Sequence, residues 1–154
     1  MSNIKTAQYC RNGHMTNYAP LEHPENNRNF CSECGEPTLL NCPNCQVSIE
    51  DLGYMLPKAP KYCRNCGQPF PWTEMALAAA HEFIQSQEQL SEEDRATLDS
   101  SIEILAKDTP LTTVRANKVK TILNKAGTGV ASMFRDIVVD IMSETAKKII
   151  FPNN

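Results

Sequence analysis

Eight side chains that can bind metal ions form four pairs in the first half of the chain. The pairs are Cys10/His14, Cys31/Cys34, Cys42/Cys45 and Cys63/Cys66, and they include all seven cysteines of the sequence. Thiolate and imidazole are the usual ligands of structural zinc, and each ion takes four of them in a tetrahedral arrangement. The four pairs therefore predict two structural zinc ions.

The ligand pairs belong to an internal repeat. The interval from Cys10 to Cys31 is 21 positions and equals the interval from Cys42 to Cys63, so the second set follows the first after 32 positions. The flanking residues repeat as well, because the segment FCSECGEP at 30–37 matches YCRNCGQP at 62–69. The glycine after each CxxC supplies the positive φ of a tight metal-binding turn, and the proline begins a return strand. The repeat thus predicts that the tight metal-binding turns at these CxxC pairs, which we call knuckles, share one backbone conformation.

The four pairs can be combined sequentially, or interleaved as in a RING cross-brace. A RING places only two or three residues between the second and third pairs, whereas seven residues, 35–41, separate Cys34 from Cys42. The sequential arrangement, two tandem zinc ribbons, is therefore favoured. Each ribbon is too small to fold on apolar burial alone, so zinc must stabilise it, by about 10 kcal/mol or more per site.

His14 has a rival as the fourth ligand of the first site. Its spacing from Cys10 is one residue longer than the corresponding spacing in the second repeat, and His23 lies in the same loop. The Asn12-Gly13 turn can bring the imidazole of His14 back to the Cys10 thiolate, whereas Pro24 follows His23 directly. We expect His14 to complete the site, with His23 as the alternative.

Disulfide, redox and iron chemistry account for the cysteines less well than zinc does. A disulfide framework would leave one of the seven unpaired, and residues 1–8 lack the basic start and apolar stretch of a secretory signal. A thioredoxin-like site would use a single CxxC beside a βαβ pattern, which leaves an iron or iron–sulfur centre as the remaining alternative to zinc. We therefore expect a reduced, cytoplasmic protein. Two closed four-ligand sites and the absence of Ser-His-Asp, HExxH and phosphate-loop motifs predict that it is not an enzyme.

The composition changes after Trp72, where helix-forming residues replace cysteine and glycine. Capping residues mark the helix starts, and glycine or proline marks the ends. The predicted helices run from Thr73 to about Gln87, from a Ser91 cap through Leu105, from Thr109-Pro110 to Ala126, and from Val130 to Phe151. His81, in the first of these, has no metal-ligating neighbours in the pattern and is interpreted as an ordinary surface or boundary residue.

The expected fold class is a small zinc-stabilised β region of tandem zinc ribbons, residues 1–70, followed by an all-α region of three to four helices, residues 71–154. The helix over 130–151 has the strongest apolar face in the chain, which core packing explains best; a face for self-association or for a membrane surface is the alternative. Six charged residues within it exclude a transmembrane span. Gly127-Thr128-Gly129 lacks the Lys-Ser/Thr of a phosphate loop and is interpreted as a helix-end turn.

The charge distribution bears on possible partners. Seven thiolates and two Zn²⁺ ions together add three negative charges to the formal −3, giving about −6. Nevertheless, an acid-free stretch of the second ribbon can stack bases and contact phosphates. Its residues are Tyr54, Lys58, Lys61, Tyr62 and Arg64. A simpler explanation is that Arg11, Lys61 and Arg64, which lie beside zinc ligands in the sequence, offset the negative charge of the thiolates. In the helical region, nine acids and two bases between Glu74 and Asp108 precede a basic segment, 115–135, whose opposite charge can pair with them.

The segments CRNGH at 10–14, CPNC at 42–45 and YCRNCGQPFPWT at 62–73 together resemble an uncharacterised bacterial family catalogued as domain of unknown function 2321. The resemblance covers most of the chain and implies a bacterial zinc-ribbon protein, without implying an activity. Residues and resemblance together favour a non-enzymatic adaptor or regulatory protein that binds another protein, with self-association through the C-terminal helix as a further option. The alternative is an accessory factor that binds RNA or single-stranded DNA through the basic–aromatic stretch.

Overall fold

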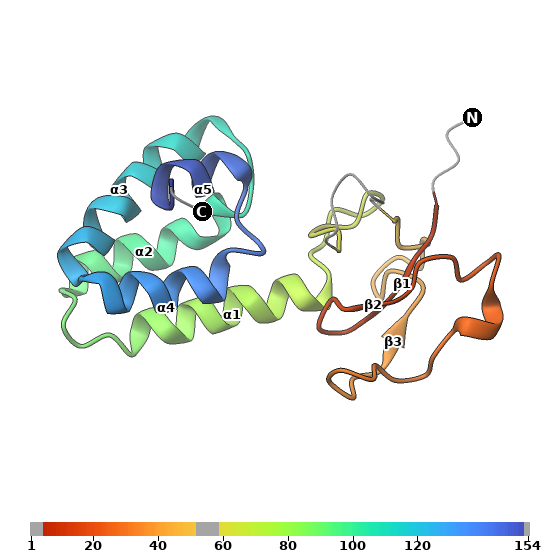
Figure 1. Ribbon diagram of the computed structural model, residues 1–154. Coiled ribbons are helices and arrows are strands. Elements are labelled where there is room, and N and C mark those ends of the chain that lie inside the picture. The colour runs from red at the N-terminus through yellow and green to blue at the C-terminus, as the bar shows by residue number, and fades with distance from the viewer. Residues whose placement is uncertain (1–4, 52–58, 153–154) are drawn as a thin grey trace. The chain divides into compact units, whose positions relative to one another are not determined.

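The structure is a computed structural model that describes residues 5–51 and 59–152. The chain forms two compact units, Met1–Met75 and Ala76–Asn154. Short strands and ligand-bearing loops make up the first unit, and helices make up the second (Figure 1). The fold class expected from the sequence, ribbons followed by an all-α region, is confirmed.

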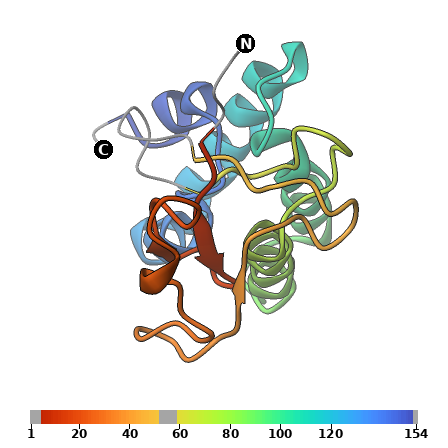
Figure 2. The same ribbon diagram turned by 90° about the vertical axis from the view of Figure 1, so that its right-hand side faces the viewer.

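A small antiparallel sheet organises the first unit. Its strands are β1 (Gln8–Cys10), β2 (Met15–Asn17) and β3 (Thr38–Leu39), in the order β2-β1-β3, and a short 3-10 helix, η1 (Pro24–Asn26), follows β2. Tyr9 pairs with Met15 on one side and with Leu39 on the other. The view in Figure 2 shows these strands in red and orange, with the loops extending from them. The turn between β1 and β2 carries the first ligand pair.

Aromatic side chains form the core of this ribbon unit. The ring of Trp72 lies 4.8 Å from that of Phe70 and 5.4 Å from that of Tyr9, measured between centroids. Ile49 and the ligands Cys42 and Cys63 belong to the same buried cluster. The indole Nε1 of Trp72 donates to the Pro60 carbonyl at 2.8 Å, which satisfies the polar atom of this buried ring.

The second unit contains five helices among its described residues, rather than the three to four predicted. They are α1 (Pro71–Gln85), whose first turn belongs to the ribbon unit, α2 (Glu92–Leu105), α3 (Pro110–Ala126), α4 (Thr128–Val138) and α5 (Glu144–Ile150). Ser91 and Thr109 cap α2 and α3 as predicted, and Thr109 forms a reciprocal capping box with Thr112. Thr73 is not a cap, because α1 already begins at Pro71 and the Thr73 hydroxyl donates to the Lys61 carbonyl.

The prediction of a single helix over 130–151 was wrong, because this segment contains two separate helices, α4 and α5. Helix α4 starts earlier, at Thr128, and ends at Val138, and Ser143 then caps α5 by accepting a hydrogen bond from the Ala146 amide. The Ser143 amide donates to the carbonyl of Leu105 at the end of α2, which holds the break against a neighbouring helix. Ser143 caps α5 and bonds to the end of α2. These interactions favour a break in the helix although the apolar periodicity continues across it.

Helix α3 packs against α2, α4 and α5 around one hydrophobic core. The apolar face predicted over 130–151 is used here: Phe134, Val138, Ile141, Met142 and Ile150 are all buried in this core. Core packing therefore accounts for that face, as expected. None of the described helices is both long and apolar enough to cross a membrane.

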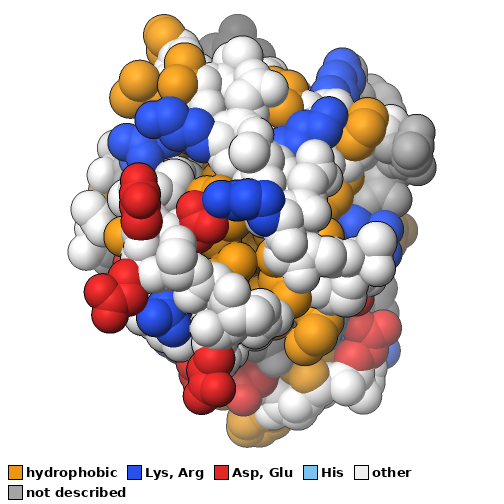
Figure 3. Space-filling view, turned by 90° about the vertical axis from the view of Figure 1, so that its left-hand side faces the viewer, with side chains coloured by type: hydrophobic (Ala, Val, Ile, Leu, Met, Phe, Trp, Pro, Cys, Tyr) orange, Lys and Arg blue, Asp and Glu red, His pale blue; other side chains and the backbone are white. Residues whose placement is uncertain are grey.

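Acidic α2 and basic α3 are neighbours in this unit, so their opposite charges complement one another in part. Lys125 forms an ion pair with Asp94 at 2.9 Å, and Arg115 donates a hydrogen bond to Ser100. Figure 3 shows acidic and basic side chains interspersed with apolar ones on one face of the protein. Such mixed charge is typical of a solvated helical surface.

Candidate metal centres

The eight predicted ligands gather into two groups of four. Cys10, His14, Cys31 and Cys34 form the first, and Cys42, Cys45, Cys63 and Cys66 form the second; the ligand atoms within each group lie within 4.8 Å of one another. The grouping is sequential, as the long connection between Cys34 and Cys42 predicts, and is not that of a RING cross-brace. All seven cysteines are free thiols, so no disulfide competes for them.

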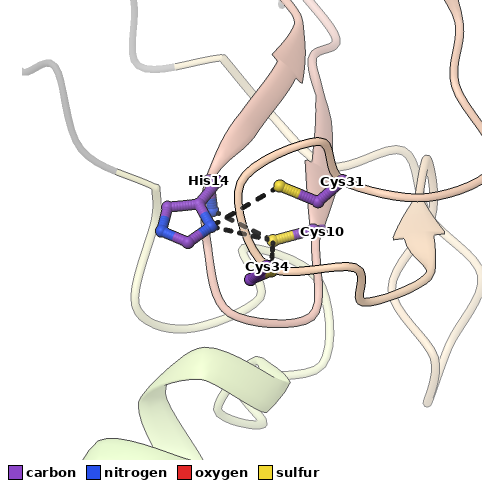
Figure 4. A group of neighbouring side chains, drawn as sticks. All are labelled: Cys10, His14, Cys31 and Cys34. Atoms are coloured by element: carbon purple, nitrogen blue, oxygen red, sulfur yellow. Dashed lines mark hydrogen bonds between the residues drawn. The ribbon is translucent and has the colours of Figure 1, made fainter.

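In the first site, Cys10 at the end of β1, His14 in the β1–β2 turn, and the Cys31/Cys34 pair of one knuckle face a common point. His14 Nδ1 lies 3.4 Å from Cys10 Sγ and 3.6 Å from Cys31 Sγ, and Cys34 Sγ lies 3.7 Å from Cys10 Sγ (Figure 4). Cys10 and Cys31 are buried, whereas Cys34 is exposed and the side chain of His14 is 42% exposed. The site therefore lies at the surface of the ribbon unit, with one side open to solvent.

The second site contains only cysteines and lies deeper. Cys42 Sγ is 3.8 Å from Cys66 Sγ, and Cys45 Sγ is 3.6 Å from Cys63 Sγ. Cys42 and Cys63 belong to the buried aromatic cluster, against which Cys45 and Cys66 pack with partial exposure. A metal ion held here would border the core on the side of Cys42 and Cys63, with Cys45 and Cys66 partly exposed on the other.

These distances fit zinc. A tetrahedral ion with Zn–S bonds of about 2.3 Å and Zn–N bonds of about 2.0 Å places its sulfur ligands roughly 3.8 Å apart and a sulfur and a nitrogen roughly 3.5 Å apart. The five separations given above, 3.4 to 3.8 Å, match these values, and the other ligand atoms of each group lie within 4.8 Å of one another. Thiolate-rich sets of four ligands also exclude hard cations such as Mg²⁺ and Ca²⁺. Both groups are therefore compatible with a structural metal ion.

The structure brings His14 to the first site and places the other two histidines elsewhere. His23 Nδ1 contacts Glu25 at 3.1 Å, away from the thiols. His81 lies in the helical unit between two carboxylates, Asp99 at 2.5 Å and Glu103 at 2.8 Å. The geometry therefore favours His14 over its rival. His81 is half-buried and belongs to neither ligand group, as expected of a boundary residue, and it also contacts two carboxylates.

The knuckles share one backbone construction. The amide of the first cysteine donates to a carbonyl five residues later, from Cys31 to Glu36, from Cys42 to Val47 and from Cys63 to Gln68, at 2.8 to 2.9 Å. Gly35 and Gly67 follow their CxxC pairs with φ of +77° and +75°, as predicted for this turn. The third knuckle adopts the same conformation without glycine, because Gln46 has φ of +67°.

The metal-free thiols of each site differ in acidity. Burial raises the pKa of Cys10 to about 11, and a backbone hydrogen bond from Glu36 lowers the pKa of Cys34 to about 6. In the second site burial raises the pKa of Cys42 to about 11, and a side-chain hydrogen bond from Asn65 lowers the pKa of Cys45 to about 6. Because the metal binds thiolates, it must release protons from the buried cysteines, and the affinity for metal should fall as pH decreases.

Sequence reasoning missed a set of asparagines around the thiols. The side chain of Asn65 lowers the pKa of Cys45, and that of Asn44 lowers the pKa of Cys66 by hydrogen bonding across the second site. The backbone amides of Asn12 and Asn65 also donate to Cys10 and Cys63. Such outer partners orient ligands and support the thiolate charge. The signal in the sequence is asparagine two residues after the cysteine, which occurs in three of the four pairs.

Fold and sites together define a protein of two tandem four-ligand metal ribbons followed by a helical unit. The sequence matches the family DUF2321, described as "Uncharacterized protein conserved in bacteria", over residues 3–150. The chain therefore belongs to this bacterial family, as the resemblance indicated. Comparison with curated proteins and with solved structures gives no match.

Proposed function

We propose that this protein is a non-enzymatic cytoplasmic adaptor or regulatory protein that binds another protein through its first ribbon. The observation that carries the proposal is the apolar surface of that ribbon. Met15, Tyr18, Leu21 and Phe30 are between 45% and 72% exposed. Exposed aromatic residues and methionine within one short segment are typical of protein interfaces.

The two ribbons differ in this property although they share a repeat. Within the described residues of the second ribbon, 42–51 and 59–69, no large apolar side chain is exposed to a comparable degree. Phe30 and Tyr62 hold the same position in the repeat, yet Phe30 is 62% exposed and Tyr62 is half-buried. The exposure of large apolar side chains is therefore particular to the first ribbon among the described residues. It does not follow from the knuckle conformation, which both ribbons share.

In this proposal both sites hold zinc, and the zinc is structural. Four protein ligands leave a tetrahedral ion without an open position for water or substrate, which argues against metal catalysis. The ions hold short loops rigid, because segments of this size bury too little apolar surface to fold alone. A rigid surface loses less entropy when it binds a partner.

The proposal is tested by cross-linking and affinity capture with the full-length, zinc-loaded protein in its native host. Tyr18→Ser with Leu21→Ser should reduce capture of a specific partner by about tenfold or more, while zinc content stays at two ions. Met133→Ser is the matched control, because Met133 is 57% exposed on the helical unit. Absence of a specific partner, or capture that both variants retain fully, would contradict the adaptor function.

The second candidate is binding of RNA or single-stranded DNA through the basic–aromatic stretch of the second ribbon. Tyr54 and Lys58 lie outside the described residues. Arg64 is exposed beside Cys63, which supports a role in phosphate contact, whereas Lys61 is half-buried. Fluorescence anisotropy with a labelled RNA oligonucleotide tests this function. Binding that Lys61→Ala with Arg64→Ala abolishes would support it, and binding that persists unchanged would dismiss this site.

A further inference from the structure

The edge of strand β2 borders an open groove. A hollow of about 270 Å³ is lined by Met15, Thr16, Asn17 and Tyr18 on one side and by Asn26 and Arg28 on the other. A second hollow of about 170 Å³ shares Met15, Thr16 and Arg28 and extends to Ser32, Glu33 and the ligands His14 and Cys31 of the first metal site. Because they share three residues, the two hollows form one groove, which we call the β2 groove.

The lining residues show how the groove relates to the strand. Successive side chains of a strand point to opposite faces. A groove lined by five consecutive residues, His14 to Tyr18, therefore follows one edge of the strand rather than one of its faces. This edge is open in the part of the chain that the structure describes, because β2 pairs with β1 alone.

The main chain of β2 has the hydrogen-bonding capacity that an added strand needs. Backbone hydrogen bonds from Met15 to Tyr18 lead to β1 and to no other described segment. Unpaired amides and carbonyls along an exposed edge are a template for an incoming extended chain. The side-chain amide of Asn17 already has partners within the ribbon, because it donates to the His23 carbonyl and to the side-chain oxygen of Asn27.

The side chains of the groove define what such a chain must carry. Met15 and Tyr18 offer apolar surface, and methionine adapts its shape to different partners. Arg28 is exposed, and its guanidinium forms no ion pair with any described residue. The nearby acids are engaged instead, Glu25 with His23 at 3.1 Å and Glu33 with His14 at 3.7 Å. The groove therefore combines an apolar wall with one arginine that forms no ion pair with a described carboxylate.

We infer that the β2 groove binds an extended peptide segment of a partner protein, which pairs with β2 as a fourth strand and places a carboxylate on Arg28 beside an apolar side chain on Met15 and Tyr18. This inference rests on the proposed adaptor function and specifies its partner. The main chain supplies affinity, and the acidic and apolar side chains supply selectivity.

Two other occupants fit the groove less well. A nucleic acid strand is bound through several cations, whereas the lining of this groove contains one arginine and no lysine. A second copy that paired edge to edge would bring a second Arg28 against the first, and like charges at an interface oppose association. A peptide with a single carboxylate needs only one cation, and its charge is opposite to that of Arg28.

The test selects displayed random peptides against the full-length, zinc-loaded protein and measures the binding of synthetic copies. We expect enriched peptides with Asp or Glu next to an apolar residue, and amide shift changes in the NMR spectrum confined to 14–18 and 26–28. Methylation of alternate peptide nitrogens, which removes main-chain donors, should weaken binding about tenfold or more. Arg28→Gln should weaken binding about tenfold, whereas Arg11→Gln, an exposed arginine of the same ribbon outside the groove, should not.

The inference is overturned if no peptide is enriched, or if bound peptides are indifferent to both nitrogen methylation and Arg28→Gln. It is equally overturned if an RNA oligonucleotide shifts the same amides, or if light scattering detects a dimer that Arg28→Gln abolishes. The adaptor function is judged separately. Partner capture in the host that depends on Tyr18 and Leu21, together with failed peptide binding, would reject the β2 groove and retain the adaptor function.

Discussion

Gly13 lies directly against Trp72, so the turn that carries the first metal site rests on the aromatic core of the ribbon unit. A Cβ atom at Gly13 would lie 3.1 Å from both Cβ and Cγ of Trp72, and Gly13 has φ of +86°. The same core contains Cys42 and Cys63 of the second site. Both metal sites therefore border one aromatic cluster, although no ligand is shared between them.

Gly13→Ala should destabilise the ribbon unit by about 2 to 4 kcal/mol, since it adds the cost of positive φ to a steric overlap with Trp72. Gly35→Ala is the matched control, because Gly35 has φ of +77° but a Cβ added there would meet no atom within 4 Å. The control should lose only about 1 to 2 kcal/mol. Urea unfolding followed by tryptophan fluorescence measures both, and equal losses would show that the Trp72 contact is unimportant.

His14→Ala should weaken zinc binding at the first site, because it removes a ligand atom 3.4 Å from Cys10 Sγ. Loss of an outer partner costs about 10- to 100-fold in affinity, so loss of a ligand should cost roughly 100-fold or more. His23→Ala should leave the affinity unchanged. Native mass spectrometry of the wild type should find two zinc ions, and competition with a chromogenic chelator measures the affinities. A stronger effect of His23→Ala would transfer the ligand role to the rival.

Removal of zinc should unfold the ribbon unit and spare the helices. Trp72, the one tryptophan of the chain, lies in the ribbon core, whereas the core of the helical unit contains no metal ligand. Titration with a strong chelator should therefore shift the tryptophan emission to longer wavelength while the far-ultraviolet helix signal stays nearly constant. The free energy lost is that of metal binding, about 10 kcal/mol or more per site. Parallel loss of both signals would show that the helices depend on the ribbons.

Gln46→Gly should stabilise the ribbon unit, which few substitutions do. Gln46 is the one described residue other than glycine with positive φ, at +67°, and it occupies the turn that glycine fills in two other knuckles. Relief of this conformation is worth about 1 to 2 kcal/mol, less the extra entropy that glycine gains on unfolding, which leaves about 0.5 to 1 kcal/mol. Chemical unfolding at constant free zinc measures the change. A destabilised variant would mean that the Gln46 side chain contributes more than the strain costs.

The ligand sets were predictable because metal chemistry fixes both residue type and spacing, and a 32-residue repeat reports the spacing twice. Capped helices were predictable for the same local reason, as Ser91 and Thr109 show. The break between α4 and α5 was not, because the apolar period continues across it and the bond from Ser143 to Leu105 is a tertiary contact. The positive φ of Gln46 was not predictable either. Glycine is the usual residue at positive φ, so a glutamine gives no sign in the sequence that the fold requires this conformation.

His81 should titrate above its ordinary pKa. Its ring bridges Glu103 and Asp99 of α2. The hydrogen bond to Glu103 has the largest effect and raises the pKa above 6.5; burial, the next largest, opposes it, and the hydrogen bond to Asp99 adds to the rise. A histidine whose pKa is raised on folding stabilises the fold fully below its unfolded pKa and loses that contribution as pH rises through the folded pKa. The helical unit should therefore be slightly less stable at pH 8 than at pH 6, with a small difference because the groups are partly exposed.

NMR titration of the imidazole should show a lower pKa in Glu103→Gln and an unchanged one in Asp136→Asn, whose carboxylate pairs with Arg135 instead. An identical pKa in wild type and Glu103→Gln would mean that the carboxylate does not hold the proton, and the pH dependence of the helical unit would then need another source.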